Sequence, residues 1–205
     1  MTVQNGSNYP PPQNLDQFSI DNHSFGGLLQ VSTGYRWERD HDWFPGSMLG
    51  LTYQHLFNSN INGNVTQYSD PEFTNYSYQW GGTTNLVLVT EKLNLYQTKH
   101  WSPYASVGIG IALNETGQYT ESAFTGVTPR ISPDYAGGST SNFAYQFGVG
   151  LDYQLNASWL LSVGYLYQNI GTLESGIGQS TWSETSLNGG SVGQNAVLGS
   201  VTYLF

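Results

Sequence analysis

The chain of 205 residues contains no cysteine, few charged residues and no long apolar run. The absence of cysteine excludes structural disulfides, thiol catalysis and thiolate metal sites. Charged residues make up 9% of the chain, whereas a soluble globular domain carries about 25%, so water is not the main environment of its surface. No stretch approaches the roughly 18 apolar residues of a membrane-spanning helix. A membrane-spanning form therefore requires a β-barrel, in which neighbouring strands pair their backbone groups.

Basic residues are also scarce, with five Lys and Arg against 14 Asp and Glu and a net charge of −9. This balance disfavours a nucleic-acid partner, because binding to phosphates needs basic patches. A signal peptide is not visible either, since the first residues lack a basic start and an apolar run. An exported protein needs such a segment, and we expect Met1 to replace one that has been removed.

The sequence is instead rich in glycine, in aromatic residues and in strict alternation of apolar and polar positions. The last eleven residues show this most clearly: Val197, Val201, Tyr203 and Phe205 fall on one face of a strand, and small or polar residues fall on the other. Eleven residues are enough for a tilted strand to cross a bilayer. We interpret this segment as the closing strand of a barrel.

Seven segments alternate in this way, and their connections are short and long in turn. The segments are residues 25–37, 47–57, 76–95, 103–114, 143–155, 159–171 and 195–205. The short connections are 38–46, 97–102 and 156–158, and the long ones are 58–75, 115–142 and 172–194. Outer-membrane barrels have short periplasmic turns and longer outer loops. The chain is therefore predicted to be one domain over 1–205, an all-β transmembrane barrel of up-and-down antiparallel strands with three long outer loops.

The strand number indicates that one strand is incomplete, because bacterial single-chain barrels have an even number of strands. Eight strands are expected natively, and seven are clear in this chain. We predict that Thr2–Gln4 is the tip of a truncated first strand and that residues 5–24 form the first outer loop, so that the clear barrel strands lie within 25–205. A rearranged strand within residues 1–22 is the alternative, but Pro10–Pro12 disfavour a paired strand there.

Four stretches carry a resemblance to a known family: residues 102–112 (SPYASVGIGIA), 143–153 (FAYQFGVGLDY), 159–167 (WLLSVGYLY) and 201–205 (VTYLF). In this order they resemble the small eight-stranded bacterial outer-membrane barrels of the OmpA-transmembrane or opacity type. The resemblance implies a location in the bacterial outer membrane and, usually, no catalysis. It also implies assembly by the outer-membrane insertion machinery through the last strand, with Val201, Tyr203 and Phe205 as the C-terminal insertion signal.

Three charged residues are predicted to face the barrel interior. The strand parity places Arg36, Glu91 and Asp152 on the inward face, and it places Lys92 toward lipid, where its stem can reach the interface. Buried charges persist when they are paired, and the interior of a small barrel is just wide enough for side chains to fill it. We therefore predict a structural plug of these three residues, with a catalytic carboxylate pair as the less favoured alternative.

Aromatic residues and acidic residues gather at the strand ends and in the outer segments. The rings are predicted to form two interfacial belts, of which the outer one comprises Phe57, Tyr76, Tyr78, Trp80, Phe143, Tyr145 and Tyr167. The outer segments carry nine acidic residues against Arg130 alone. These carboxylates could share divalent cations with lipopolysaccharide, but the solubility of exposed loops is the simpler interpretation.

The histidines do not indicate an active site. His41 lies between two aspartates in a turn without spaced partners, and His23 and Ser24 are adjacent, so they point to opposite faces of a strand. We therefore predict no catalytic residue, no metal site and no cofactor.

The sequence favours a structural or surface-interaction role, such as adhesion or envelope integrity, for a barrel with a plugged polar lumen. The expected partners are outer-membrane lipid and lipopolysaccharide, the insertion machinery, and a host or surface ligand at the outer loops. Two alternatives stay open: a narrow channel for small or apolar solutes, as in OmpW-type barrels, and an outer-membrane lipid-modifying enzyme.

Overall fold

A computed structural model describes the chain except for residues 6, 25, 41, 131–134 and 179–184 and the side chains of residues 22–24, 58 and 118. The described residues form one antiparallel sheet of ten strands, in the order β1-β2-β5-β6-β7-β8-β9-β10, and β3 and β4 also pair with β5. None of the described helices is both long enough and apolar enough to cross a membrane. The strands are β1 (Thr2–Gln4), β2 (Leu15–Phe18), β3 (Asn22–Ser24), β4 (Gly27–Glu38), β5 (Trp43–Thr66), β6 (Thr74–Tyr96), β7 (Trp101–Ala123), β8 (Gly138–Gln154), β9 (Trp159–Glu174) and β10 (Asn188–Tyr203), with 3₁₀ turns η1 (Gln67–Ser69) and η2 (Pro71–Phe73).

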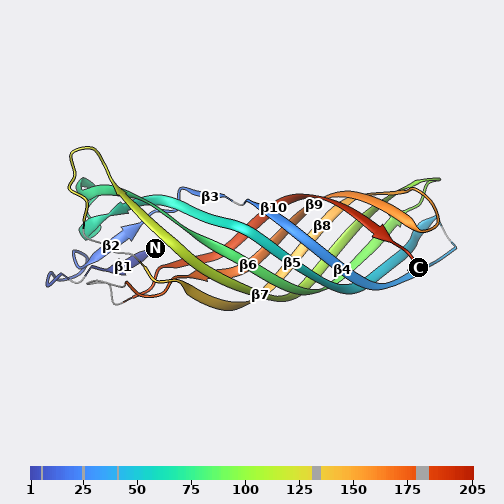
Figure 1. Cartoon of the computed structure of the whole chain (residues 1–205), viewed down its shortest axis with the longest axis horizontal. Coiled ribbons are helices and arrows are strands. Elements are labelled where there is room, and N and C mark those ends of the chain that lie inside the picture. Colours follow the sequence, from blue (N-terminus) through green and yellow to red (C-terminus); the bar gives the residue numbers. More distant parts are fainter. Residues whose placement is uncertain (6, 25, 41, 131–134, 179–184) are drawn as a thin grey trace.

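The seven long strands β4 to β10 coil into an elongated barrel (Figure 1). This confirms the all-β, up-and-down antiparallel prediction and its seven clear strands. The C terminus lies at one end of the long axis, whereas β1, β2 and the 3₁₀ turns lie toward the other (Figure 1). We call the latter the outer end and the former the lower end. Six successive antiparallel pairings leave β4 and β10 running in the same direction, and the described pairings do not join these two strands.

The strands extend much further toward the outer end than the sequence predicts. The segment expected to be loop from residue 58 is strand up to Thr66, and β7 and β9 likewise continue to Ala123 and Glu174. The prediction of loop was wrong for these stretches because their outward residues are mostly Asn, Ser and Thr. Such residues are typical of loops, but here they cover a barrel wall whose apolar side faces inward.

The predicted arrangement of the N-terminal residues was also wrong. Thr2–Gln4 does form a strand, β1, but it pairs with β2 instead of lying beside β4. Within the expected first outer loop, β2 and β3 pair with β5, while Pro10–Pro12 stay in a turn, as their chemistry requires. The physical cause is burial, because Val3 and Phe18 of this hairpin enter the apolar core at the outer end.

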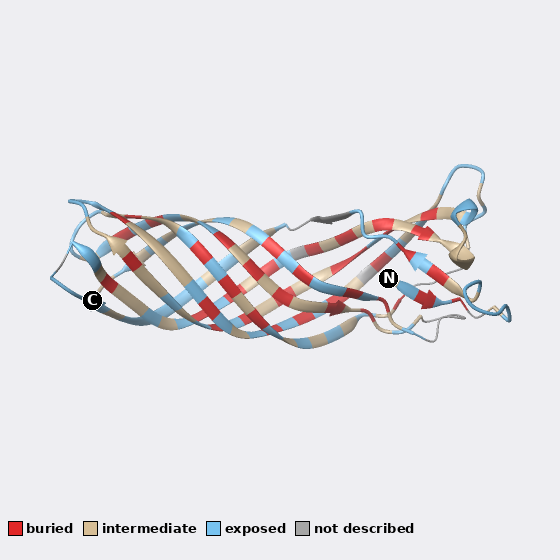
Figure 2. Cartoon of the chain, turned by 180° about the vertical axis from the view of Figure 1, so that it is seen from behind, coloured by how far each residue is buried: buried red, intermediate tan, exposed pale blue. Residues whose placement is uncertain are grey.

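The predicted inward and outward faces are confirmed on six of the long strands and inverted on β6. Outward residues such as Ile109 and Val149 are exposed, and the alternation of exposed and buried positions is visible along the ribbons (Figure 2). On β6, Leu86 and Leu88 are buried inside the barrel, whereas Val87 and Val89 face outward. Because this strand is apolar on both faces between residues 86 and 89, its sequence pattern does not define which face is which.

Candidate functional site

The lower part of the barrel interior contains a buried ion pair. Lys92 Nζ on β6 lies 2.6 Å from Asp152 Oδ1 on β8, and Asp152 is 1% exposed. Ser162 Oγ on β9 donates to Asp152 Oδ1 at 2.6 Å, and Asn94 Nδ2 donates to Asp152 Oδ2 at 2.9 Å. Two strands, β6 and β9, thus supply three donors to one carboxylate, which is the arrangement that lets a buried charge persist.

An aromatic ring lies inside the barrel beside this pair. Lys92 Nζ lies 4.1 Å from the centroid of the Tyr104 ring, which is a cation–π distance. A side chain at Gly150 or Gly164 would collide with the Tyr104 ring and hydroxyl. The glycines of β8 and β9 therefore make room for a large ring inside a narrow barrel.

Above the charges, the interior is lined by amides. Gln54 Nε2 on β5 donates to Gln30 Oε1 on the neighbouring β4 and, at 2.8 Å, to Gln146 Oε1 on β8 across the barrel. Gln168 and Gln194 follow on β9 and β10 in register with each other. These five amides form one polar layer across the interior.

Beside the amides lies an apolar layer. Six inward residues from five strands are completely buried: Leu56, Leu86, Leu88, Ala112, Ala144 and Ile170. These side chains have no contact with solvent. The inward residues therefore include charges, amides and hydrocarbon side chains.

A second ionic cluster fixes the N-terminal hairpin to the outer end. Arg130, which follows β7, donates from Nε and Nη2 to both carboxylate oxygens of Glu121, at 2.6 and 2.8 Å. Its Nη1 donates to Asp16 Oδ2 on β2 at 2.9 Å. Tyr119 Oη also donates to Glu121, and the backbone N–H of Tyr68 donates to Asp16 Oδ1 at 3.0 Å. We refer to residues 1–18 held in this way as the outer cap.

The electrostatics of this cluster keep the arginine charged. Burial acts to lower the pKa of Arg130, but its hydrogen bonds and its proximity to Glu121 and Asp16 outweigh burial and raise the pKa above the ordinary arginine value. Bidentate pairing of guanidinium with carboxylate is the strongest of these charge-assisted contacts. The sequence offered one signal for this cluster, because Arg130 is the single base among the outer segments.

Comparison with known proteins places this architecture in a family. A family model described as the outer membrane protein beta-barrel domain matches residues 5–205. The chain belongs to this family. No curated protein and no solved structure matches the chain significantly. The family implies a location in the bacterial outer membrane, so the outward apolar residues of this outer-membrane barrel face lipid.

The predicted interior site of the outer-membrane barrel is only partly assembled as expected. Asp152 does lie in the interior, but its partner is Lys92, which was predicted to face lipid. Arg36 also faces inward, but its Nε lies 3.2 Å from Glu38 Oε1 at the exposed lower rim. This contact is an ion pair without hydrogen-bond geometry, since Arg36 Nε has no hydrogen-bond partner. Glu91 was placed wrongly, because β6 is inverted and its side chain is exposed on the outer wall.

The inversion of β6 leaves a carboxylate among lipid-facing residues. Glu91 stands in register with Leu49 on β5 and Val107 on β7, and both of these side chains are exposed on the outer wall. We predict that Glu91→Leu raises the free energy of unfolding in lipid vesicles by about 1–2 kcal/mol, because a charge on the lipid face of a barrel is unfavourable. Denaturant titration followed by tryptophan fluorescence measures this change.

The adjacent residue provides the matched control for Glu91. Lys92→Leu changes the inward face and leaves Asp152 without its ammonium, so it should lower the free energy of unfolding. Equal effects of the two leucine substitutions would show that β6 does not present alternate residues to lipid and to the interior.

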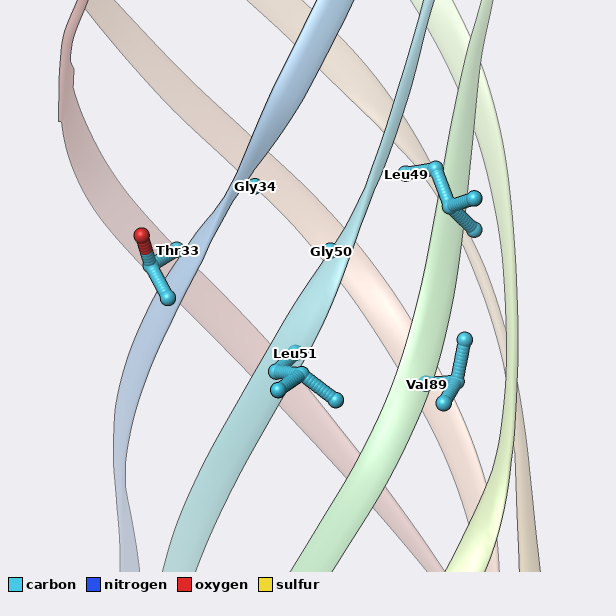
Figure 3. Close-up of a pocket in the computed structure, with 6 residues that line it drawn as sticks. All are labelled: Thr33, Gly34, Leu49, Gly50, Leu51 and Val89. Atoms are coloured by element: carbon cyan, nitrogen blue, oxygen red, sulfur yellow. The ribbon is translucent and has the colours of Figure 1, made fainter.

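The outer wall beside Glu91 is hollowed into a shallow apolar groove (Figure 3). Leu49, Leu51 and Val89 border it, together with Thr33 and the facing pair Gly34 and Gly50. A Cβ on Gly34 would collide with the backbone of Leu49 and Gly50, so this pair allows β4 and β5 to approach closely. On this face, the groove meets the acyl chains of the surrounding lipid.

The residues of the predicted insertion signal face outward, whereas those of the predicted outer aromatic belt are partly exposed and partly buried. Val201, Tyr203 and Phe205 are exposed on the outward face of the last strand and the tail that follows it. The predicted outer aromatic belt is wrong for Tyr76, Tyr78 and Trp80, which are buried in the apolar core at the outer end, whereas Phe57 and Phe143 are exposed as expected.

No group of three or more His, Cys, Asp or Glu side chains suited to hold a metal ion occurs in the described part of the chain. His41 lies outside the described residues, and His55 Nδ1 lies 2.8 Å from Asn85 Oδ1.

Proposed function

We propose that this outer-membrane barrel does not conduct solutes and has a structural or surface-interaction role, such as adhesion or envelope integrity. The observation that carries the proposal is the apolar layer of completely buried side chains around Leu86, Leu88 and Ile170. The Lys92–Asp152 pair blocks the interior below this layer, and the outer cap covers it above. We propose no catalytic role.

The outer end is the part of the molecule that supports a surface role. The long strands continue beyond their lipid-facing stretches, and their apolar residues turn inward there, as Ile61, Trp80 and Tyr119 do. The result is a compact extension with its own apolar core, capped by residues 1–18. We propose that this extension meets lipopolysaccharide and surface ligands, and that Val201, Tyr203 and Phe205 engage the insertion machinery during assembly.

Planar-bilayer recording tests the proposal, and we expect no steady conductance from the purified barrel. The triple variant Leu56→Ala, Leu86→Ala, Leu88→Ala removes packing from the apolar layer and should produce measurable openings. The lipid-facing double variant Val87→Ala, Val89→Ala is the control and should stay silent. Steady conductance of the unmodified barrel that a lumen-blocking reagent abolishes would favour the narrow-channel alternative.

A further inference from the structure

Three aromatic rings lie together at the outer end of the barrel. Tyr9 precedes the Pro10–Pro12 turn, Tyr68 lies in η1, and Phe73 ends η2. The ring centroids of Tyr9 and Tyr68 are 6.4 Å apart, and those of Tyr68 and Phe73 are 5.7 Å apart, with Tyr68 nearly perpendicular to both neighbours. Tyr9 is 64% exposed and Phe73 is 43% exposed. We call these three rings the aromatic platform.

The platform is held in place by the outer cap. Tyr68 and Ser69 have φ values of 56° and 55°, a left-handed conformation that is rare for a bulky residue such as tyrosine. The Tyr68 N–H donates to Asp16, whose carboxylate also binds Arg130, and Ser69 Oγ donates to the Leu15 carbonyl. The strained turn is therefore fixed by the buried Asp16 and by the Leu15 carbonyl. The ring of Tyr68 makes an edge-to-face contact with each of its two exposed neighbours.

The charged side chains beside the exposed rings of the platform are acidic. Asp70 and Glu72 lie in the turn between Tyr68 and Phe73, and Glu72 is exposed. The outer segments contain one basic residue, Arg130, and its guanidinium is bound to Asp16 and Glu121. An anionic ligand would meet like charge here, which disfavours its binding.

We infer that the aromatic platform binds a neutral saccharide, and that this saccharide is carried by another surface outside the cell. This inference rests on the proposed surface-interaction role and names its ligand class. A pyranose ring has an apolar C–H face, which suits exposed aromatic rings, and a rim of hydroxyls, which donate to carboxylates such as Asp70 and Glu72. The platform lies at the end of the long axis that is remote from the C terminus (Figure 1), so its ligand approaches from outside the cell.

A printed glycan panel, probed with the full chain in lipid nanodiscs, tests this inference. The panel contains neutral, sialylated and sulfated glycans, and we expect binding to the neutral ones. Tyr9→Ala and Phe73→Ala should each weaken that binding by about tenfold or more, whereas Tyr68→Phe, which keeps the ring, should retain it. Phe124→Ala is the matched control, because Phe124 is 41% exposed outside the platform, and it should bind normally.

Two competitors separate the ligand classes and sources. Tetramethylammonium chloride should not displace the glycans, and displacement by it would overturn the inference in favour of a cationic ligand. Displacement by lipopolysaccharide from the same outer membrane would overturn the assignment to an opposing surface. Binding confined to anionic glycans, equal loss in Phe124→Ala, or no binding to any glycan would also overturn the inference. None of these results alters the conductance test, so the failure of the saccharide site and the failure of the proposed function are distinguishable.

Discussion

Replacement of Asp152 by alanine is expected to lower the free energy of unfolding of the barrel by about 3–5 kcal/mol, because it leaves a buried charge without its partner. The Lys92 ammonium would keep Ser162 and the Tyr104 ring as neighbours but would lose the carboxylate at 2.6 Å. Asn94 would also lose the acceptor of one of its hydrogen bonds. Urea unfolding in lipid vesicles, followed by tryptophan fluorescence, measures the change.

Two further variants separate the ion pair from general disturbance of the interior. The double variant Lys92→Met, Asp152→Leu removes both charges and should be much closer to the unmodified barrel than Asp152→Ala alone. Arg36→Ala breaks an ion pair at the rim, where Glu38 is largely exposed, and should cost less than about 1 kcal/mol. A double variant as unstable as Asp152→Ala would show that packing, and not the unpaired ammonium, causes the loss.

The sequence predicts the barrel itself because each lipid-facing stretch obeys one rule. Residues such as Ile109, Val149 and Val163 alternate with Gly and Ser, and in a chain with so little charge this is the pattern of a strand with lipid on one side and the barrel interior on the other. The face was misassigned on β6 because Leu86 and Leu88 belong to the apolar layer inside the barrel. A strand whose inward residues belong to such an apolar layer is apolar on both faces. Its composition then assigns the inward face to lipid by mistake.

The extension of the strands at the outer end was not predicted because the two faces of the wall exchange polarity above the lipid. There the apolar residues face inward and the polar residues face outward. On β5 the change coincides with a register shift between Leu56 and Ser59. Before it, even-numbered residues such as Gln54 face inward, and after it odd-numbered residues such as Ile61 and Val65 do. A β-bulge of this kind adds one residue to a strand and exchanges its faces. Alternation interrupted in this way, with Asn and Ser on the outside, is indistinguishable from a polar loop in a single sequence.

The interior partners required knowledge of tertiary structure. Asp152 and Lys92 are 60 residues apart, and Asp16 and Arg130 are 114 apart, so local patterns do not indicate that they meet. The sequence indicated which residues were unusual, namely a charge on an inward face and a single base among many acids. It did not indicate which of them were neighbours, because this depends on the register across several strands.

Arg130, which binds Asp16 of the outer cap, is expected to be as important locally as Asp152 is for the barrel. Arg130→Met leaves the carboxylates of Asp16 and Glu121 together at a buried site without a counter-charge. We expect the cap to detach while the lipid-embedded strands stay folded, because loss of one partner of a buried pair costs about 3–5 kcal/mol. Amide exchange in residues 1–18 and around Tyr68 should become about a hundredfold faster or more, and hydrogen-exchange mass spectrometry measures this.

A second substitution and a matched control decide whether charge is the cause. Adding Glu121→Gln to Arg130→Met should slow the exchange again, since it removes one of the two facing carboxylates and so relieves the repulsion between them. Arg39→Ala removes an exposed arginine at the opposite end of the barrel and should leave the exchange of residues 1–18 unchanged. If Arg130→Met kept the slow exchange of the unmodified chain, the cap would depend on the packing of Val3 and Phe18 alone, and the ionic cluster would have no part in holding the aromatic platform in place.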